Sequence, residues 1–195
     1  MIAKTVEYIC KELNLRYDDP ATASLQDFAV LGNVARLDTD TDATQAEMVR
    51  NVVVTLVNIE EEKTLKNGSH YVQNGDTLSK RNPTIFLNLY VMFSCADSNH
   101  LEALKKISRV ALFFQRKNVF TRENTAAPFP VEAGVEKIIL DLFTLNFEQI
   151  NHLWGILGGK YSPSLLYKVR IVAVQNALLD ETATVKDIET KANAN

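Results

Sequence analysis

The segment closest to a chemical motif is NHLWGILGGKYSP, residues 151 to 163, in which glycines precede a lysine. A phosphate-binding loop needs a strand, two glycines separated by four residues, and then a lysine and a hydroxyl residue that open a helix. Here Gly155 and Gly159 are separated by three residues, Lys160 is followed by Tyr161, and the predicted element before the glycines is a helix. This spacing argues against a nucleotide site.

The same segment fits the end of a helix that is followed by a strand. Gly158 or Gly159 can adopt the left-handed conformation that ends a helix, and Pro163 blocks continuation. Lys160 falls near the negative end of the helix dipole. These residue types are explained without any ligand.

Other residues with chemical potential are scattered. His70, His100 and His152 are predicted in a polar loop, at a helix start and within a helix, and none has the spacing of a metal motif. Solvent-facing or capping roles are expected for them. Cys10 and Cys95 are predicted in a helix and a strand, without CxxC spacing, which favours buried thiols in a reducing cytoplasm over a disulfide.

The acidic run DTDTD, residues 38 to 42, raises the question of calcium binding. An EF-hand loop needs glycine at its sixth position and glutamate at its twelfth, where this sequence has Ala43 and Val49. A solvated loop is the better interpretation. With no GxSxG motif either, we assign no catalytic, cofactor-binding or metal-binding residue, and we predict neither an enzyme nor a cofactor.

Composition limits the class of protein. The 195 residues are 46% hydrophobic, enough for the core of one domain, and the formal net charge of -3 argues against nucleic acid as the main partner. The N-terminus is amphipathic rather than a signal peptide, and the run TIFLNLYVMFSCA is too short to span a bilayer. We therefore expect no membrane-spanning segment and a cytoplasmic location at assembly.

Hydrophobic periodicity predicts an α/β (α+β) fold, a single domain with one mixed sheet flanked by about three helices. Predicted helices occupy the first 17 residues and residues 99–120 and 147–157, and predicted strands occupy 27–38, 50–62, 83–96, 135–145 and 164–174. An exposed loop, 38–46, is expected between the first two strands. The apolar stripe predicted to pack the second helix on the sheet comprises Leu101, Leu104, Ile107, Ser108, Ala111, Leu112 and Gln115.

Domain limits follow from composition. Residues 1–175 are predicted to form the folded domain, and 176–195 a polar C-terminal tail that is disordered alone or ordered on assembly. Two polar or proline-rich segments, 62–84 and 122–134, are long enough to reach neighbouring molecules.

Three segments in this order carry a family resemblance: NPTIFLNLYVMFSC, HLEALKKISRVALFFQRKNVFT and LNFEQINHLWGILGGKYSPSLLYKVRIVAV. They resemble the DUF4255 family, also called the Pvc16 N-terminal domain, from Met1 to about Val174. The most specific positions are Leu145, Asn146, Asn151, Leu153, Trp154, Leu157, Gly158, Gly159, Lys160, Tyr161, Pro163, Ser164, Leu166, Tyr167, Val169 and Arg170.

The resemblance implies a cap, or tail terminator, of a phage-tail-like contractile injection system. Such a protein forms a ring, expected to be a hexamer, that closes the baseplate-distal end of the inner tube and sheath and ends their polymerisation. Its partners would be other copies of itself and the tube and sheath proteins. Some relatives carry a further C-terminal domain, whose role is not transferred to residues 176–195.

Alternatives remain at this point. The chain could be another structural adaptor of the same particle, at the tube or baseplate, or a small-molecule-binding or enzymatic domain, for which the sequence offers no set of titratable residues. Trp154, at helical spacing with Ile150 and Leu157, is predicted to be a core residue, with an interface contact as the alternative.

Overall fold

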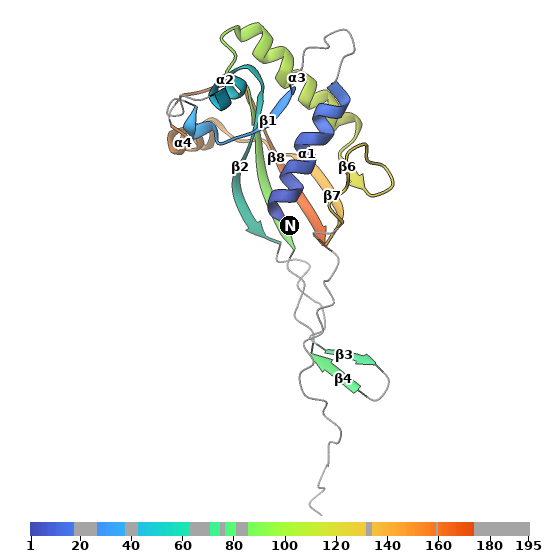
Figure 1. Cartoon of the computed structure of the whole chain (residues 1–195). Helices are drawn as coiled ribbons and strands as arrows, with labels where there is room; N and C mark the ends of the chain where they lie inside the picture. Colours follow the sequence, from blue (N-terminus) through green and yellow to red (C-terminus); the bar gives the residue numbers. More distant parts are fainter. Residues whose placement is uncertain are drawn as a thin grey trace, which may run out of the picture.

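A computed structural model describes residues 1–17, 27–37, 43–62, 71–74, 77–80, 86–131, 134–158 and 160–173 of the chain (Figure 1). A six-stranded sheet has the strand order β1-β2-β5-β8-β7-β6. Its strands are β1 (Ala29–Leu31), β2 (Val52–Glu61), β5 (Leu87–Ser94), β8 (Ser164–Ala173), β7 (Val135–Leu142) and β6 (Val119–Thr121). β1 and β2 are parallel, and the other neighbours are antiparallel. The predicted mixed sheet is confirmed.

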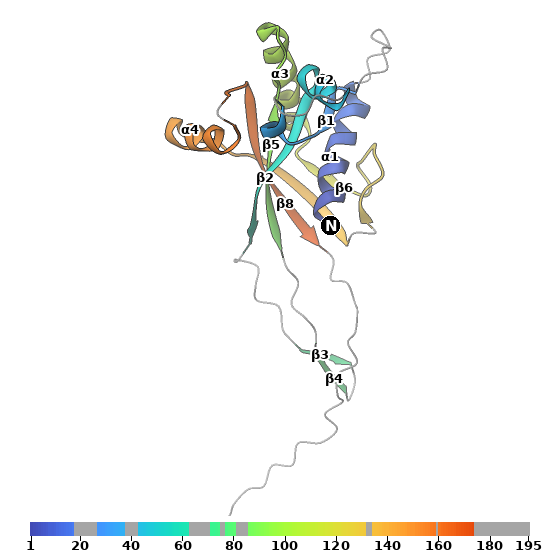
Figure 2. The ribbon, with the colours of Figure 1, turned by 60° about the vertical axis from the view of Figure 1, so that its left-hand side comes forward.

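Helices cover both faces of the sheet, and one face carries more helices than the other. They are α1 (Ile2–Tyr17), α2 (Ala43–Arg50), α3 (His100–Arg116) and α4 (Phe147–Ile156), with a short 3-10 helix, η2 (Val34–Arg36). α1 and α3 lie on one face, and α4 lies on the other (Figure 2). The three predicted helices correspond to α1, α3 and α4.

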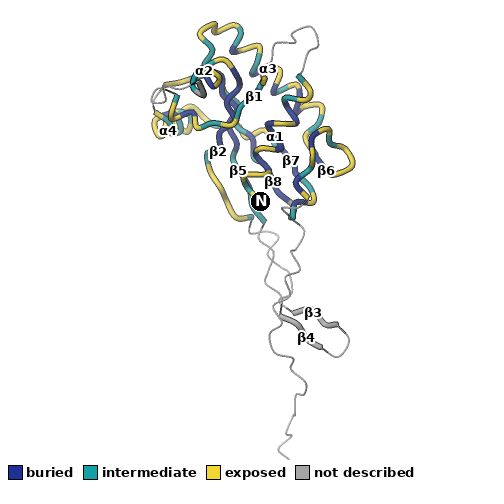
Figure 3. The backbone as a smooth tube through the Cα atoms, in the orientation of Figure 1, coloured by how far each residue is buried: buried dark blue, intermediate teal, exposed yellow. Residues whose placement is uncertain are grey.

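Strand alternation divides the side chains between two cores. In β5, Leu89, Val91 and Phe93 point into the main core under α1 and α3, whereas Met92 packs with Trp154 of α4 on the opposite face. Because successive side chains of a strand point to opposite faces, this continuous apolar run serves both layers. The tube in Figure 3 shows buried residues along β5 and the first half of β2, and exposed residues along the second half of β2 and on α3 and α4.

The region between the first two strands differs from the prediction. β1 spans three residues rather than most of 27–38, and the chain enters η2 after Gly32. A Cβ atom added to Gly32 would lie 2.5 Å from the Met48 sulfur, so α2 packs closely against this turn. α2 supplies the crossover that a parallel β1–β2 pair requires, where an exposed loop was expected over 38–46. The acidic run 38–42 lies outside the described residues.

The polar segment 62–84 is not a loop throughout. Strands β3 (Tyr71–Asn74) and β4 (Thr77–Lys80) form an antiparallel hairpin, a two-stranded sheet separate from the main one (Figure 1). The register of the hairpin ends with Asn74 opposite Thr77.

The predicted face of α3 is wrong. The side chains buried against the sheet are Ala103, Ile107, Val110, Phe113 and Phe114. Of the predicted stripe only Ile107 is among them, and Leu101, Leu104 and Leu112 are 60%, 43% and 51% exposed. The helix carries apolar residues on two faces, and the aromatic face packs on the sheet because Phe114 contacts Phe93 and Tyr167 there.

Candidate assembly surfaces

The described residues contain no group of three or more His, Cys, Asp or Glu side chains placed to hold a metal ion. His100 is exposed at the start of α3, and His152 is exposed on α4. His70 lies outside the described residues. None of the helices described in the structure is long and apolar enough to cross a membrane.

The two cysteines are buried free thiols, as predicted. Burial raises the pKa of the Cys10 thiol to about 12, with a smaller contribution of the same sign from Asp27. Burial likewise raises the pKa of the Cys95 thiol. Both groups are therefore held in the unreactive protonated form.

The segment from Asn146 to Tyr161 has the predicted helix-end geometry. Asn146 and Gln149 form a capping box at the start of α4, and Gly158 follows its end with φ +105°. Trp154 is 5% exposed and packs with Val34 and Met92, so the predicted core role is confirmed. Tyr161 meets the Trp154 ring edge-on, at 5.8 Å between centroids. Gly159 lies outside the described residues.

Large apolar side chains are exposed around α4. Phe147 is 92% exposed, Ile156 82%, Tyr161 69% and Leu142 57%. Between α4, β8 and the segment after β7 there is an open hollow of about 200 Å³, lined by Trp154 and its neighbours. We call these four exposed side chains and the hollow the α4 surface. Leu142 and Tyr161 line the same hollow, and exposed apolar groups that lie together are typical of a protein contact.

The outer side of α3 is a second exposed surface, and it is apolar and basic. Leu101 and Leu112 lie on the side of the helix that faces away from the sheet, with Lys105, Arg109 and Arg116 beside them. Lys105 is paired with Glu102 at 2.7 Å. We call this side of the helix the α3 surface. It is on the opposite side of the sheet from α4 (Figure 2).

The edge strands of the main sheet are closed by asparagine side chains. On β1, the Ala29 N–H donates to Asn14 Oδ1 at 2.8 Å, and Asn14 Nδ2 donates to the Ala29 carbonyl at 2.9 Å. On β6, the Thr121 N–H donates to Asn124 Oδ1 at 3.0 Å, and Asn124 Nδ2 donates to the Val119 carbonyl at 3.0 Å.

These backbone groups face away from the sheet, because β1 pairs with β2 through Phe28 and Gly32, and β6 approaches β7 through the Asn118 carbonyl. Each asparagine therefore occupies the hydrogen-bonding positions that an added strand would use. Strand addition is therefore disfavoured at β1 and β6. β1 pairs only with Val52 to Val54, and among the described strands none lies beside the rest of β2 on that side.

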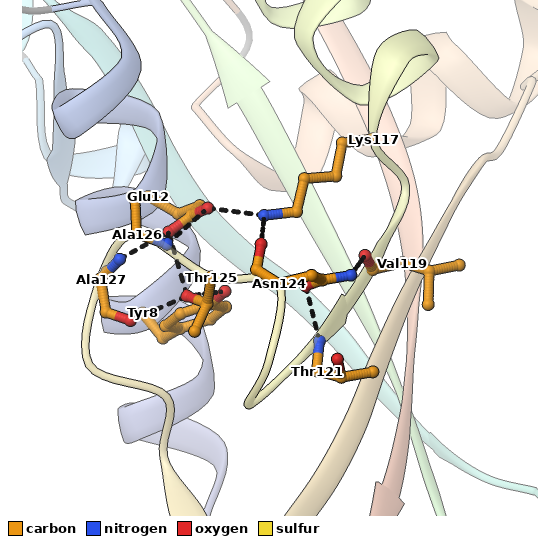
Figure 4. A network of polar contacts seen from close by, with 9 residues as sticks. All are labelled: Tyr8, Glu12, Lys117, Val119, Thr121, Asn124, Thr125, Ala126 and Ala127. Atoms are coloured by element: carbon orange, nitrogen blue, oxygen red, sulfur yellow. Dashed lines mark hydrogen bonds and ion pairs between the residues drawn. The ribbon is translucent and has the colours of Figure 1, made fainter.

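Loop 122–134 is tied to its own chain by Glu12 (Figure 4). The buried Glu12 carboxylate accepts from Lys117 Nζ at 2.9 Å, from the Ala126 and Ala127 N–H groups at 3.0 and 2.8 Å, and from Thr125 Oγ1 at 3.2 Å. Burial acts to raise the pKa of Glu12, but the hydrogen bonds from Ala127, Lys117 and Ala126 and the Lys117 charge outweigh it and hold the pKa below its usual value.

This network changes the interpretation of two sequence features. The loop was expected to reach neighbouring molecules, whereas Ala127 and Pro130 are buried against the body of the protein. Glu12 is a charged residue of the amphipathic N-terminal segment, and it is fully buried. Its partners come from more than a hundred positions later in the chain, so local periodicity has no signal for them.

Comparisons with known proteins identify relatives. The model of the family described as the Pvc16 N-terminal domain matches residues 5–186. The fold is similar to the sheath/tube terminator, in the extended state, of the extracellular contractile injection system PVC, with a TM-score of 0.56 and 15% identity over 100% of this chain. It is also similar to the tube-terminating cap of the anti-feeding prophage, with a TM-score of 0.57 and 16% identity over 96% of this chain.

The chain spans less than two thirds of each of these solved proteins, 64% of the first and 60% of the second. No curated protein matches the chain. The family match extends beyond residue 175, the predicted end of the folded domain.

Proposed function

The chain belongs to the Pvc16 N-terminal domain family, and we propose that it is a structural terminator of a contractile injection particle. In this proposal, copies form a ring, six in number, that closes the baseplate-distal end of the inner tube and sheath and ends their polymerisation. The observation that carries it is the similarity of the whole described fold to two terminators, over 100% and 96% of this chain.

The distribution of exposed apolar groups supports ring formation. A ring of identical subunits needs a heterologous interface, in which two different surfaces of each copy meet. The α3 surface and the α4 surface are separate, and the closed edges at Asn14 and Asn124 disfavour strand addition. We infer that neighbouring copies and the tube and sheath proteins bind through side-chain surfaces.

We expect the contact between neighbouring copies to bury the area of an ordinary protein interface. A specific interface buries about 1,600 Å² in total, about 800 Å² from each partner. Exposed side chains such as Leu142 and Tyr161, which line the same hollow, would form its apolar centre, since large apolar residues dominate interface cores. The role requires binding and no catalysis, and it places assembly in the cytoplasm, before the finished particle acts elsewhere.

Deletion of the gene, followed by electron microscopy of the particles, tests this role. We expect tubes and sheaths of uncontrolled length, or a failure to accumulate particles, and recovery when the wild-type gene is supplied in trans. Particles of normal, uniform length with closed ends in the deletion strain would overturn the proposal. Defects confined to the baseplate end would indicate an adaptor at that end instead.

A further inference from the structure

The α3 surface continues into a hollow between the C-terminal ends of α1 and α3. The hollow measures about 510 Å³ and is lined by Arg16 and Tyr17 of α1, Phe113 and Arg116 of α3, and Lys117 and Asn124 after it. Tyr17 joins the two helices, because its hydroxyl donates to the Arg109 carbonyl at 2.6 Å and its ring lies 6.2 Å from that of Phe113.

Arg16 and Arg116 line this hollow, and the Arg109 carbonyl accepts the Tyr17 hydroxyl beside it. Burial raises the pKa of Tyr17, and the positive charges of Arg109 and Arg116 oppose that rise. Within the described ranges, no carboxylate forms an ion pair with Arg16, Arg109 or Arg116, whereas Lys117 is paired with Glu12. A cluster of arginines without carboxylate partners suits a binding partner that supplies carboxylates.

The same side of α3 also offers apolar contacts. Leu101 and Leu112 are 60% and 51% exposed, and Leu112 follows Arg109 by three positions, so the two side chains are neighbours on the helix. A fitting partner therefore presents carboxylates and apolar side chains together.

The C-terminal segment of the chain has this composition. Residues 176–195 contain four acidic residues and two lysines, a net charge of -4 + 2 = -2. The acidic residues are Asp180, Glu181, Asp187 and Glu189. The large apolar residues of the same segment are Leu178, Leu179, Val185 and Ile188. Charge and apolar pattern both complement the α3 surface.

The direction of β8 favours a neighbouring copy over the same copy. Ile171, near the end of β8, pairs with Leu87 at the start of β5, whereas α3 follows the other end of β5, where Ser94 pairs with Ser164. The chain thus leaves the sheet at the end opposite α3 (Figures 1 and 2). The 22 residues from 174 to 195 reach at most about 75 Å when extended, enough to meet another molecule.

We propose that residues 176–195 of one copy dock on the α3 surface and its basic hollow in the neighbouring copy of the assembled terminator. Carboxylates of the segment pair with Arg16, Arg109 and Arg116, and its apolar side chains contact Leu112 and Leu101. The contact links successive subunits. This inference rests on the proposed terminator ring.

Cross-linking in assembled particles tests the docking. A deletion strain supplies two full-length variants with different tags, one with Leu112→Cys and the other with Ile188→Cys. Electron microscopy first establishes that the particles are capped, and the particles are then oxidised. We expect a disulfide-linked heterodimer of the two tagged copies. The native thiols of Cys10 and Cys95 are buried and therefore do not compete with the introduced cysteines.

The matched control replaces Leu112→Cys by Leu31→Cys, which is also exposed but lies on β1, outside both proposed surfaces, and it should give no such product. Arg109→Glu with Arg116→Glu should lower the yield several-fold, and Asp180→Lys with Glu181→Lys in the partner should restore it. Capped particles without the heterodimer, or with equal yields from Leu112→Cys and Leu31→Cys, overturn the docking and leave the terminator role standing. Normal particle length in the deletion strain overturns the terminator role itself.

Discussion

At the scale of single residues, the Glu12 carboxylate holds loop 122–134 against α1. Glutamine at this position keeps one acceptor but brings an N–H₂ group toward Lys117 and the Ala126 and Ala127 amides, which are all donors. Disruption of a buried ion pair costs about 3 to 5 kcal/mol. We expect Glu12→Gln to lower the free energy of unfolding by about this amount at pH 7, as measured by urea denaturation.

The pH dependence follows from the direction of the pKa shift. Because the folded-state pKa of Glu12 lies below its unfolded value, the carboxylate stabilises the fold above the unfolded value, about 4.3, and this contribution is lost as pH falls through the folded pKa. The difference between wild type and Glu12→Gln should therefore shrink at acid pH. The control is Glu7→Gln, exposed on the same helix, which should change stability by less than about 0.5 kcal/mol. Equal stability of all three proteins at pH 7 would contradict this assignment.

Trp154 is a second residue whose role can be measured. Its side chain is 5% exposed between Val34 and Met92, so Trp154→Ala should leave a cavity and cost about 3 to 5 kcal/mol of unfolding free energy. Phe147→Ala, 92% exposed on the same helix, should leave thermal stability nearly unchanged. If Trp154→Ala keeps the wild-type melting temperature while particle assembly fails, the tryptophan is an interface anchor instead.

Asn124 is expected to protect the β6 edge. Asn124→Ala removes the side-chain bonds to Thr121 and Val119 but keeps the main-chain carbonyl that accepts from Lys117. We expect a loss of about 1 to 3 kcal/mol, since each hydrogen bond contributes about 0.5 to 1.5 kcal/mol, together with concentration-dependent self-association in sedimentation experiments. Asn118→Ala is the matched control. The edge-protection account fails if both variants sediment like the wild type.

At the scale of elements, α4 and α3 present the surfaces on which assembly depends in this account. We expect Phe147→Ser combined with Ile156→Ser to fold with little loss of stability, because both side chains are more than 80% exposed. The variant should fail to restore capped particles in the deletion strain. The comparison is Leu31→Ser at the β1 edge, 43% exposed, which should restore them. Normal capping by the α4 variant would exclude the α4 surface as a contact.

Most elements could be predicted because their patterns are local. The apolar run of β5, the amphipathic pattern of α1 and the glycine and proline after α4 each act within a few residues. The orientation of α3 could not be predicted, because apolar residues occupy two of its faces and the choice depends on Phe93 and Tyr167 in distant strands. α2 and the short β1 depend likewise on their packing around Gly32 and Met48.

The candidate surfaces also differ in whether the sequence indicated them. The segment around Trp154, which carries the most specific part of the family resemblance, lies beside the α4 surface, so the sequence indicated its region. The α3 surface and the asparagine-closed edges became visible only in three dimensions, since Asn14 and Ala29, for example, are 15 positions apart.

At the scale of the whole molecule, we propose that copies of this chain form a closed ring at one end of the particle. The fold offers two separated exposed surfaces, β1 and β6 strands capped by asparagine side chains, and a loop bonded to α1 through Glu12, an arrangement suited to contacts between preformed subunits. Little rearrangement of the sheet is then needed on assembly.

A cryo-electron microscopy reconstruction of the particle ends tests this claim most directly. The particles should come from the deletion strain supplied with the tagged full-length chain, so that the tag identifies its position. We predict a closed ring of six copies at the end distal to the baseplate, in contact with the last tube and sheath layers. A single copy, an open spiral, or density for the tagged chain only at the baseplate end would contradict it.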